Sequence, residues 1–214
     1  MPGHSAYPKF ATMNPDADRI IELYQRHARA WAQERGNRLM ERAWLDRFGA
    51  LLPAGAAVLD IGCGSGEPIA RYLIQQGCHV TGVDSSPELI ALCSASFPDL
   101  AWHIADMRTL ALTRRFDGLL AWDSFFHLCT DDQRRMFAIF RNHAAPRAAL
   151  MFTSGPAHGE AIGSYRGEPL DHASLDAAEY RALLNANGFE VVAHVIEDPD
   201  CGNHTVWLAQ FETG

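Results

Sequence analysis

Residues 58–68 read VLDIGCGSGEP, a short apolar run followed by a turn with three glycines in five positions. The run is typical of a buried strand, and the turn is expected to lead into a helix. Glycine-rich turns of this kind usually hold a phosphate at a helix N-terminus. Here Asp60 precedes the glycines and Glu67 follows them, and both carboxylates would repel a phosphate. We therefore expect a ligand that presents positive charge to this turn.

Strand-like and helix-like segments alternate along the chain, which predicts an α/β fold. Apolar runs predict seven strands, at 56–62, 79–84, 101–106, 116–124, 148–155, 189–197 and 204–212. Helical periodicity and capping residues predict helices at 67–77, 86–97, 130–144 and 174–188, and two more over 16–48 that divide at Gly36. This order predicts a mostly parallel sheet with helices on both faces and one antiparallel strand. Residues 1–15 indicate a loose arm, and residues 155–173 follow no clear period.

The ends of the next two strands supply further polar groups for a ligand. Asp84 ends the second strand 20 residues after Gly64, where an acid accepts from both hydroxyls of a ribose. Asp106 ends the third strand and can accept from the exocyclic amine of adenine, while Met107 offers a backbone donor and a soft apolar contact. These groups fit a ligand with an adenine, a free ribose diol, no phosphate and a charged amino acid tail. That description matches S-adenosylmethionine.

Together these stretches resemble the motifs of the class I S-adenosylmethionine-dependent methyltransferases. VLDIGCGSG matches the first motif of that family, VTGVDSSPELI the second-strand motif, HIADMRTL the adenine motif and FDGLLAWDSFFHL the fourth-strand motif. The resemblance covers residues 20–154, and the last strands match in layout only. It implies a Rossmann-like seven-stranded sheet of order 3-2-1-4-5-7-6, with strand 7 antiparallel, in a single methyltransferase domain over residues 1–214.

The resemblance also implies roles for individual residues. Asp60 would reach the amino group of the cofactor, Asp84 would hold its ribose with Ser85 beside it, and Trp122 and Asp123 would sit by the sulfonium. The helices of 16–48 would close over the cofactor, and Arg35 would pair with its carboxylate. The expected cofactor contacts are Tyr24, Trp31, Arg35, Asp60, Gly62, Cys63, Gly64, Asp84, Ser85, Asp106, Met107 and Trp122.

Methyl transfer from a sulfonium is an in-line displacement, so the protein must hold the nucleophile dry and aligned. A base is needed only for an acceptor that keeps its proton at neutral pH. His127 follows the fourth strand, and Asp123 would share its face if this segment is helical, so the two are the candidate catalytic base and its orienting acid. His127 is equally well explained as a structural residue of its turn.

The expected acceptor is a small molecule. His158, Tyr165, Arg166 and His172 lie in 155–173, where such enzymes commonly place substrate contacts, and they suggest a polar or anionic acceptor. The formal net charge of −8 disfavours nucleic acid and anionic membranes as partners. Five cysteines, an odd number without metal-site spacing, indicate a reduced, cytoplasmic chain with no metal.

Two other functions remain open. One is a nicotinamide-dependent oxidoreductase on the same general fold, against which Glu67 and the displaced third glycine, Gly66, both argue. The other is a non-catalytic protein that binds S-adenosylmethionine and has lost methyl transfer. A test of which cofactor binds distinguishes the oxidoreductase from the methyltransferase. Only a test of methyl transfer distinguishes the non-catalytic binding protein from the methyltransferase.

Overall fold

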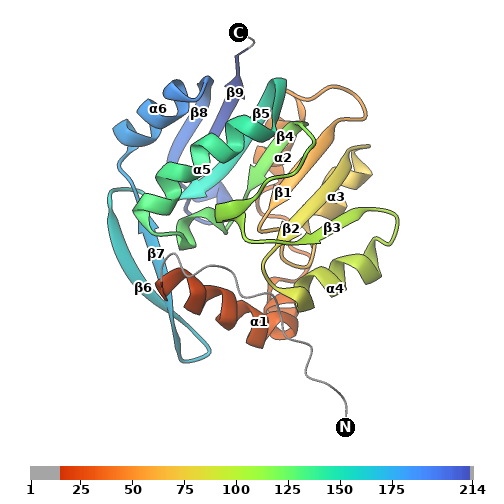
Figure 1. Ribbon diagram of the computed structural model, residues 1–214, viewed down its shortest axis with the longest axis vertical. Helices are drawn as coiled ribbons and strands as arrows, with labels where there is room; N and C mark the ends of the chain where they lie inside the picture. The colour runs from red at the N-terminus through yellow and green to blue at the C-terminus, as the bar shows by residue number, and fades with distance from the viewer. Residues whose placement is uncertain (1–14, 213–214) are drawn as a thin grey trace.

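The computed structural model describes residues 15–212 and shows a central sheet flanked by helices (Figure 1). The strands of this sheet are β1 (Ala57–Ile61), β2 (His79–Asp84), β3 (Ala101–Ile104), β4 (Phe116–Ala121), β5 (Ala144–Ser154), β8 (Phe189–Asp198) and β9 (His204–Phe211). They pair in the order β3-β2-β1-β4-β5-β9-β8, and β9 runs antiparallel to both β5 and β8. The predicted seven-stranded sheet, its order and its antiparallel strand are therefore confirmed. The expected loose arm lies outside the described residues, apart from Pro15.

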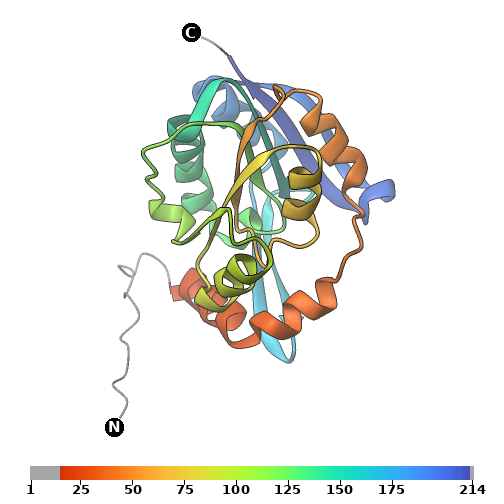
Figure 2. The ribbon, with the colours of Figure 1, turned by 90° about the vertical axis from the view of Figure 1, so that its right-hand side faces the viewer.

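Helices cover both faces of this sheet. They are α1 (Pro15–Arg35), α2 (Arg42–Gly49), α3 (Ile69–Gln75), α4 (Pro87–Ser96), α5 (Thr130–His143) and α6 (Ala177–Ala186), with 3-10 turns η1 (Met107–Thr109), η2 (Phe125–His127) and η3 (Pro199–Cys201). α5 and α6 pack on the face to which Leu59 and Ile61 point, and α2 and α3 pack on the face of Val58 (Figure 2). Successive strand residues point to opposite faces of the sheet, so the apolar side chains of β1 pack into two separate hydrophobic cores. Among the described helices, none has both the length and the apolar character that a membrane crossing needs.

Residues 155–173, which follow no clear period in the sequence, form most of a separate antiparallel hairpin. Its strands are β6 (Gly159–Tyr165) and β7 (Glu168–Ser174). β6 is exposed along almost its whole length, so no alternation of apolar and polar residues marks it as a strand. A two-stranded hairpin without a core of its own needs other elements to hold it.

α1 lies beside this hairpin and holds it by charged contacts (Figure 1). His27 Nε2 lies 2.6 Å from a carboxylate oxygen of Glu168, which also pairs with Arg26. The remaining contacts join Arg19 to Asp171, and Glu34 to both Tyr165 and Arg166. Two segments that lie more than a hundred residues apart in the sequence thus form one layer at an end of the sheet.

A buried hydroxyl joins α6 to α5 and to the end of β7. Tyr180 Oη donates to Gln133 Oε1 at 2.6 Å and accepts from the Leu175 amide at 3.1 Å. All three residues are buried, so these polar groups depend on one another and not on solvent.

We expect Tyr180→Phe to lower the free energy of unfolding by about 1–3 kcal/mol, because it removes a partner from buried polar groups. Urea unfolding followed by tryptophan fluorescence measures this change. Tyr72→Phe is the matched control, because its hydroxyl contacts Asp46 in a more exposed place, and it should cost less than about 0.5 kcal/mol. If the two variants lost equal free energy of unfolding, the stabilising role of the buried Tyr180 hydroxyl would be contradicted.

Candidate active site

A pocket of about 80 Å³ lies beneath α1, where β1, β2, β3 and β4 end. This edge of an open α/β sheet is where such folds bind ligands. Ten of the fourteen residues that the sequence predicts for the site line it, namely Tyr24, Trp31, Gly62, Gly64, Asp84, Ser85, Asp106, Met107, Asp123 and His127. The pocket therefore gathers the ends of four strands and one face of α1.

Hydrogen bonds tie the glycine turn after β1 to the end of β2. The Gly62 amide donates to the Val83 carbonyl at 2.8 Å, and the Gly64 amide donates to Asp84 Oδ2 at 3.0 Å. Asp84 Oδ1 accepts from the Ser86 amide at 2.9 Å. The carboxylate thus braces the turn, and each of its oxygens keeps a further lone pair for a ligand.

Glycine is required at two positions of this turn. Gly62 and Gly64 have φ values of 77° and 57°, which side chains disfavour. A Cβ at Gly62 would lie 2.3 Å from Ser124 Cβ, and a Cβ at Gly64 would lie 2.6 Å from the ring of Trp31. α1 therefore touches the turn directly, through Trp31.

Two carboxyls lie close together at the ends of β1 and β2, of which Asp60 is buried and Asp84 is half-buried. Burial raises the pKa of Asp60 to about 7, and the charge of Asp84 adds to this effect. Burial also raises the pKa of Asp84 to about 6, although the hydrogen bonds from Ser86 and Gly64 oppose it. A cationic ligand group would favour the ionised form of both carboxyls.

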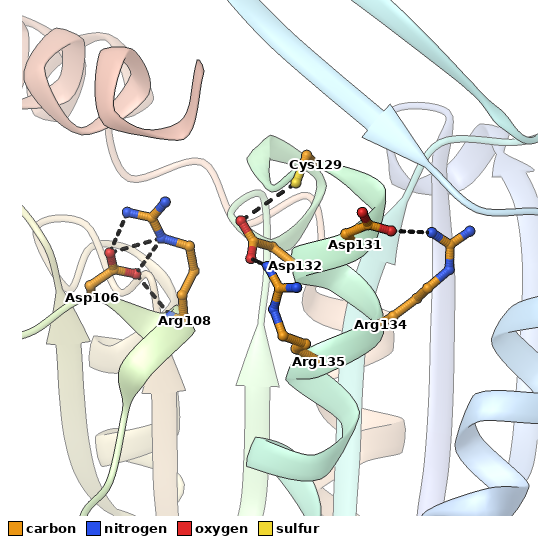
Figure 3. A network of polar contacts seen from close by, with 7 residues as sticks. All are labelled: Asp106, Arg108, Cys129, Asp131, Asp132, Arg134 and Arg135. Carbon is orange, nitrogen blue, oxygen red and sulfur yellow. Dashed lines mark hydrogen bonds and ion pairs between the residues drawn. The ribbon is translucent and has the colours of Figure 1, made fainter. Parts of the chain in front are cut away.

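The carboxylate of Asp106 lines the pocket but is already engaged (Figure 3). The Arg108 amide donates to Oδ1 at 2.8 Å, and the Arg108 guanidinium Nε lies 2.9 Å from Oδ2. Both side chains are buried, so this pair fixes the start of η1 and the place of Met107. The contact of Asp106 with an adenine amine stays a prediction, and it would have to share this carboxylate with Arg108.

His127 has different partners from those that the sequence suggests. Its Nδ1 lies 3.1 Å from the Asp171 carbonyl oxygen, so Nδ1 carries a proton and donates it. Its Nε2 lies 3.0 Å from Tyr24 Oη and accepts from that hydroxyl. Burial lowers the pKa of His127 to about 4, and burial raises the pKa of Tyr24 well above its usual value. Both side chains are therefore neutral at pH 7.

The expectation that Asp123 orients His127 is wrong. Asp123 has a φ of 48° and lies before η2, so the two residues do not share a helical face. Its Oδ1 lies 2.9 Å from Nε2 of His204 on β9. This contact with Asp123 raises the pKa of His204.

Two predicted cofactor contacts point away from the pocket. Cys63 lies beneath the glycine turn in a small cluster with Cys93 of α4. Trp122 packs on the face of α2 and α3, because it follows Ala121, which points to the opposite face. Its ring stacks on His204, with centroids 5.4 Å apart. The chain turns at Asp123, whose φ is 48°, so Asp123 lines the pocket although Trp122 packs on the other face of the sheet.

Asp60, Arg35 and Glu67 also differ from their expected places. Asp60 is buried near Asp84 and does not line the pocket. Arg35 pairs with the wholly buried Glu41, so its predicted pairing with a cofactor carboxylate is not supported. Glu67 accepts from Arg71 Nε at 2.7 Å outside the pocket, so the negative charge of the site comes from the aspartates and not from Glu67.

Three residues that support the site were not predicted from the sequence. Ser124 Oγ donates to the Ile61 carbonyl at 2.7 Å, Gln25 Oε1 accepts from Ser86 Oγ at 2.7 Å, and His204 pairs with Asp123. The position of Ser124 directly after Asp123, within the fourth-strand motif, is a local signal that could have placed it at the site. His204 lies 81 residues from its partner, and no local pattern marks it. Within residues 15–212, no cluster of three or more His, Cys, Asp or Glu side chains could hold a metal ion.

Comparisons with known proteins agree with this arrangement. Residues 58–147 match the family described as methyltransferase domain. A dTDP-4-amino-2,3,4,6-tetradeoxy-D-glucose N,N-dimethyltransferase of Saccharopolyspora spinosa is 29% identical over 136 residues, which are 62% of this chain and 52% of that protein. A dTDP-3-amino-3,6-dideoxy-alpha-D-glucopyranose N,N-dimethyltransferase of Streptomyces fradiae is 31% identical over 122 residues, 55% of this chain and 47% of that protein. The chain thus spans about half the length of these relatives.

A solved structure is similar over almost the whole chain. It is the 1,6-didemethyltoxoflavin-N1-methyltransferase of Burkholderia thailandensis with bound 1,6-didemethyltoxoflavin and S-adenosylhomocysteine. The TM-score is 0.72 at 21% identity, over 97% of this chain and 93% of that chain. This similarity establishes the fold. The fold is therefore that of a solved methyltransferase, and residues 58–147, which match the methyltransferase domain, hold all four motifs quoted above.

We expect the imidazoles of His127 and His204 to have opposite protonation states at pH 7. His127 faces one acceptor and one hydroxyl and has a lowered pKa, whereas both nitrogens of His204 face acceptors and its pKa is raised. Nitrogen chemical shifts, assigned with His127→Gln and His204→Gln, measure both states. A His127 that titrates near pH 6.5 would contradict the first assignment, and a His204 that is neutral at pH 7 would contradict the second.

We expect Asp60 to destabilise the ligand-free protein as the pH rises. Between about pH 4 and pH 7 this carboxyl is ionised in the unfolded chain but still protonated in the native protein, because its pKa is raised on folding. The free energy of unfolding therefore falls as the pH rises through this range. Asp60→Asn removes this pH dependence. The free energy of unfolding of the variant minus that of the parent should therefore be larger at pH 8 than at pH 4, by on the order of 2–4 kcal/mol. Urea unfolding at the two values measures the gain, and the exposed Asp99→Asn is the control. Parallel pH curves for Asp60→Asn and the parent would refute the prediction.

Proposed function

We propose that this chain transfers a methyl group from S-adenosylmethionine to a small-molecule acceptor by in-line displacement. The observation that carries the proposal is the pocket beneath α1, in which the glycine turn, Asp84 and Met107 face one cavity. The names of the relatives support the same class of reaction, since two are N,N-dimethyltransferases of dTDP-linked amino sugars. The toxoflavin enzyme of the same fold, bound to S-adenosylhomocysteine, adds to that support.

The pocket residues fit the parts of this cofactor. The free lone pairs of Asp84 suit the two ribose hydroxyls, and the bare backbone at Gly62 and Gly64 suits close approach of the methionine portion. Met107 and Asp106 suit the adenine. Asp60 is buried and does not line the pocket, so its predicted contact with the amino group would have to run through an intervening group such as water.

When bound, the cofactor supplies an electrophilic methyl group on a positively charged sulfur. The chain must then hold the acceptor nucleophile dry and in line. α1 forms one wall of the pocket, and β7 of the hairpin contacts both α1 and η2 beside it. We call the part formed by Tyr24, Asp123 and His127 the acceptor end, because these polar groups follow β4 or face it from α1.

His127 stays the proposed catalytic group, with a more restricted role. With a pKa of about 4 it is a weak base at neutral pH, so it does not withdraw a proton from an unreacted alcohol efficiently. As a hydrogen-bond acceptor it fixes the Tyr24 hydroxyl at the acceptor end. For an alcohol acceptor, methylation would give a strongly acidic oxonium, and only in that case would His127 suffice to take the proton.

We further propose that the chain works as a single domain in a reducing compartment such as the cytoplasm. All five cysteines are free thiols, which supports a reducing compartment. The contacts of α1 with α4 and β7, and of β7 with η2, support their action as one unit.

The two alternative functions predict different behaviour. A nicotinamide cofactor carries a pyrophosphate, which the glycine turn would have to bind although its third glycine, Gly66, is displaced from the usual dinucleotide spacing. A non-catalytic protein would bind S-adenosylhomocysteine but transfer no methyl group. Calorimetry with S-adenosylhomocysteine and with NADH tests the first alternative, and a screen of a metabolite pool with methyl-labelled cofactor tests the second.

We expect S-adenosylhomocysteine to bind, and Asp84→Ala to weaken its binding by one to three decades. Hydrogen bonds to a carboxylate contribute about 1.5–3 kcal/mol each, and about 1.4 kcal/mol is a tenfold change in Kd. Calorimetry measures both constants, with the exposed Asp99→Ala as the control. No heat with the parent at millimolar ligand would overturn the proposed function. Equal affinities of the parent and Asp84→Ala would remove Asp84 from the site.

A further inference from the structure

Asp123 is held at the acceptor end in a conformation that side chains disfavour. Its φ is 48°, and its amide donates to the buried Thr153 Oγ1 at 3.0 Å. A residue other than glycine keeps such a conformation only where its surroundings over-determine it, and such residues cluster at functional sites. The conformation brings the Asp123 carboxylate to the pocket wall, where its side chain is 29% exposed.

His204 fixes one oxygen of this carboxylate from outside the pocket. Its Nε2 lies 2.9 Å from Asp123 Oδ1, and its Nδ1 lies 2.7 Å from the Cys201 carbonyl oxygen. The contact with Asp123 is an ion pair by distance, and the nearby carboxylate and carbonyl oxygens raise the pKa of His204, which favours the charged ring. The ring stacks on Trp122. The imidazolium therefore lies against the buried Oδ1, and Oδ2 is the oxygen left for the pocket.

The other groups at the acceptor end carry no charge. His127 and Tyr24 are neutral, as their mutual hydrogen bond requires. The ring of His172 lies 4.9 Å from that of His127, and burial lowers its pKa as well. Arg108, the one guanidinium among the described residues that line the pocket, faces Asp106. Nothing described here would neutralise an anionic acceptor.

The side chains that suggested an anionic acceptor lie elsewhere. Tyr165 and Arg166 contact Glu34 on the outer side of α1. His158 is exposed in the bend before β6. Of the four residues in question, only His172 approaches the acceptor end, and it is a neutral ring there.

We propose that the acceptor is an amine whose N–H is bound by the Asp123 carboxylate, and that His204 is the positioning residue for this carboxylate. The inference rests on the proposed function. The amine reacts as the free base, after its ammonium proton has gone to solvent. Its lone pair forms the new N–C bond while the S–C bond breaks and leaves its electron pair on sulfur. The product is a methylated ammonium ion, whose N–H remains against Asp123, and it loses a proton to solvent on release.

The first test needs no knowledge of the acceptor. Sinefungin carries an amine in place of the methylated sulfonium, whereas S-adenosylhomocysteine carries a neutral thioether. The ratio of their dissociation constants therefore reports on a carboxylate at the acceptor end. Asp123→Asn should reduce the preference for sinefungin about tenfold and change the affinity for S-adenosylhomocysteine less than threefold, because hydrogen bonds between charged groups are about twice as strong as neutral ones.

His204→Gln should also reduce this preference, by about threefold or more, because the carboxylate loses its fixed orientation. His194→Gln is the matched control, since His194 lies on the same terminal strand pair and stacks on Trp207 away from the pocket. That control should leave the ratio unchanged. A ratio that His204→Gln does not lower would overturn the positioning role, and a ratio that Asp123→Asn does not lower would overturn the inference.

The second test addresses the acceptor directly. Matched sets of small amines, alcohols and carboxylates are incubated with the protein and methyl-labelled cofactor. We expect label in amines, and label in alcohols or carboxylates alone would overturn the inference while the proposed function stands. If S-adenosylhomocysteine and sinefungin both fail to bind the parent protein, the proposed function falls and this inference falls with it.

Discussion

The hydrogen bond from the Gly64 amide to the Asp84 carboxylate is the contact on which the site depends. It joins the loops that follow two neighbouring strands and holds the glycine turn in a shape that no side chain would permit. The same carboxylate accepts from Ser86, the N-cap of α4. One half-buried acid thus sets the positions of the turn, of α4 and of any ligand that lies between them. Its burial has an electrostatic cost that a cationic ligand would offset.

Much of the fold and the cofactor side of the pocket could be predicted from the sequence, because local patterns determine them. Buried parallel strands are apolar throughout, and Asp84 and Asp106 stand at strand ends, where the sheet brings them together. The rest depends on contacts that no local pattern encodes. The exposed strand β6 has no periodicity, and Arg35 turns to Glu41, a partner that is buried only in the folded chain. His204 acts on a residue 81 positions away.

The two histidines near β4 show how environment decides charge. His127 is surrounded by a hydroxyl, a backbone carbonyl and aromatic rings, and this environment favours the neutral ring. His204 lies between a carboxylate and a carbonyl, so the protonated ring is favoured. The sequence motif FFHL draws attention to the first, but the second determines how the charged side chain at the acceptor end is held. Proximity in sequence to a motif is therefore a poor guide to which histidine carries charge.

α1 forms one wall of the pocket and is itself held by the hairpin. The pocket beneath it holds about 80 Å³, whereas small-molecule sites measure roughly 300–1,000 Å³, so a nucleoside can enter only after α1 has moved. The ion pairs between α1 and the hairpin are solvent-exposed for the most part, and each such pair contributes at most about 1 kcal/mol. Moving α1 away from the hairpin therefore costs little free energy. The same movement would separate Tyr24 from His127, because Tyr24 lies on α1 and His127 lies on η2. In the proposed methyltransferase, entry of the cofactor and departure of the product would thus each break the contact between these two side chains, a kind of step that often limits turnover in enzymes with a moving cover.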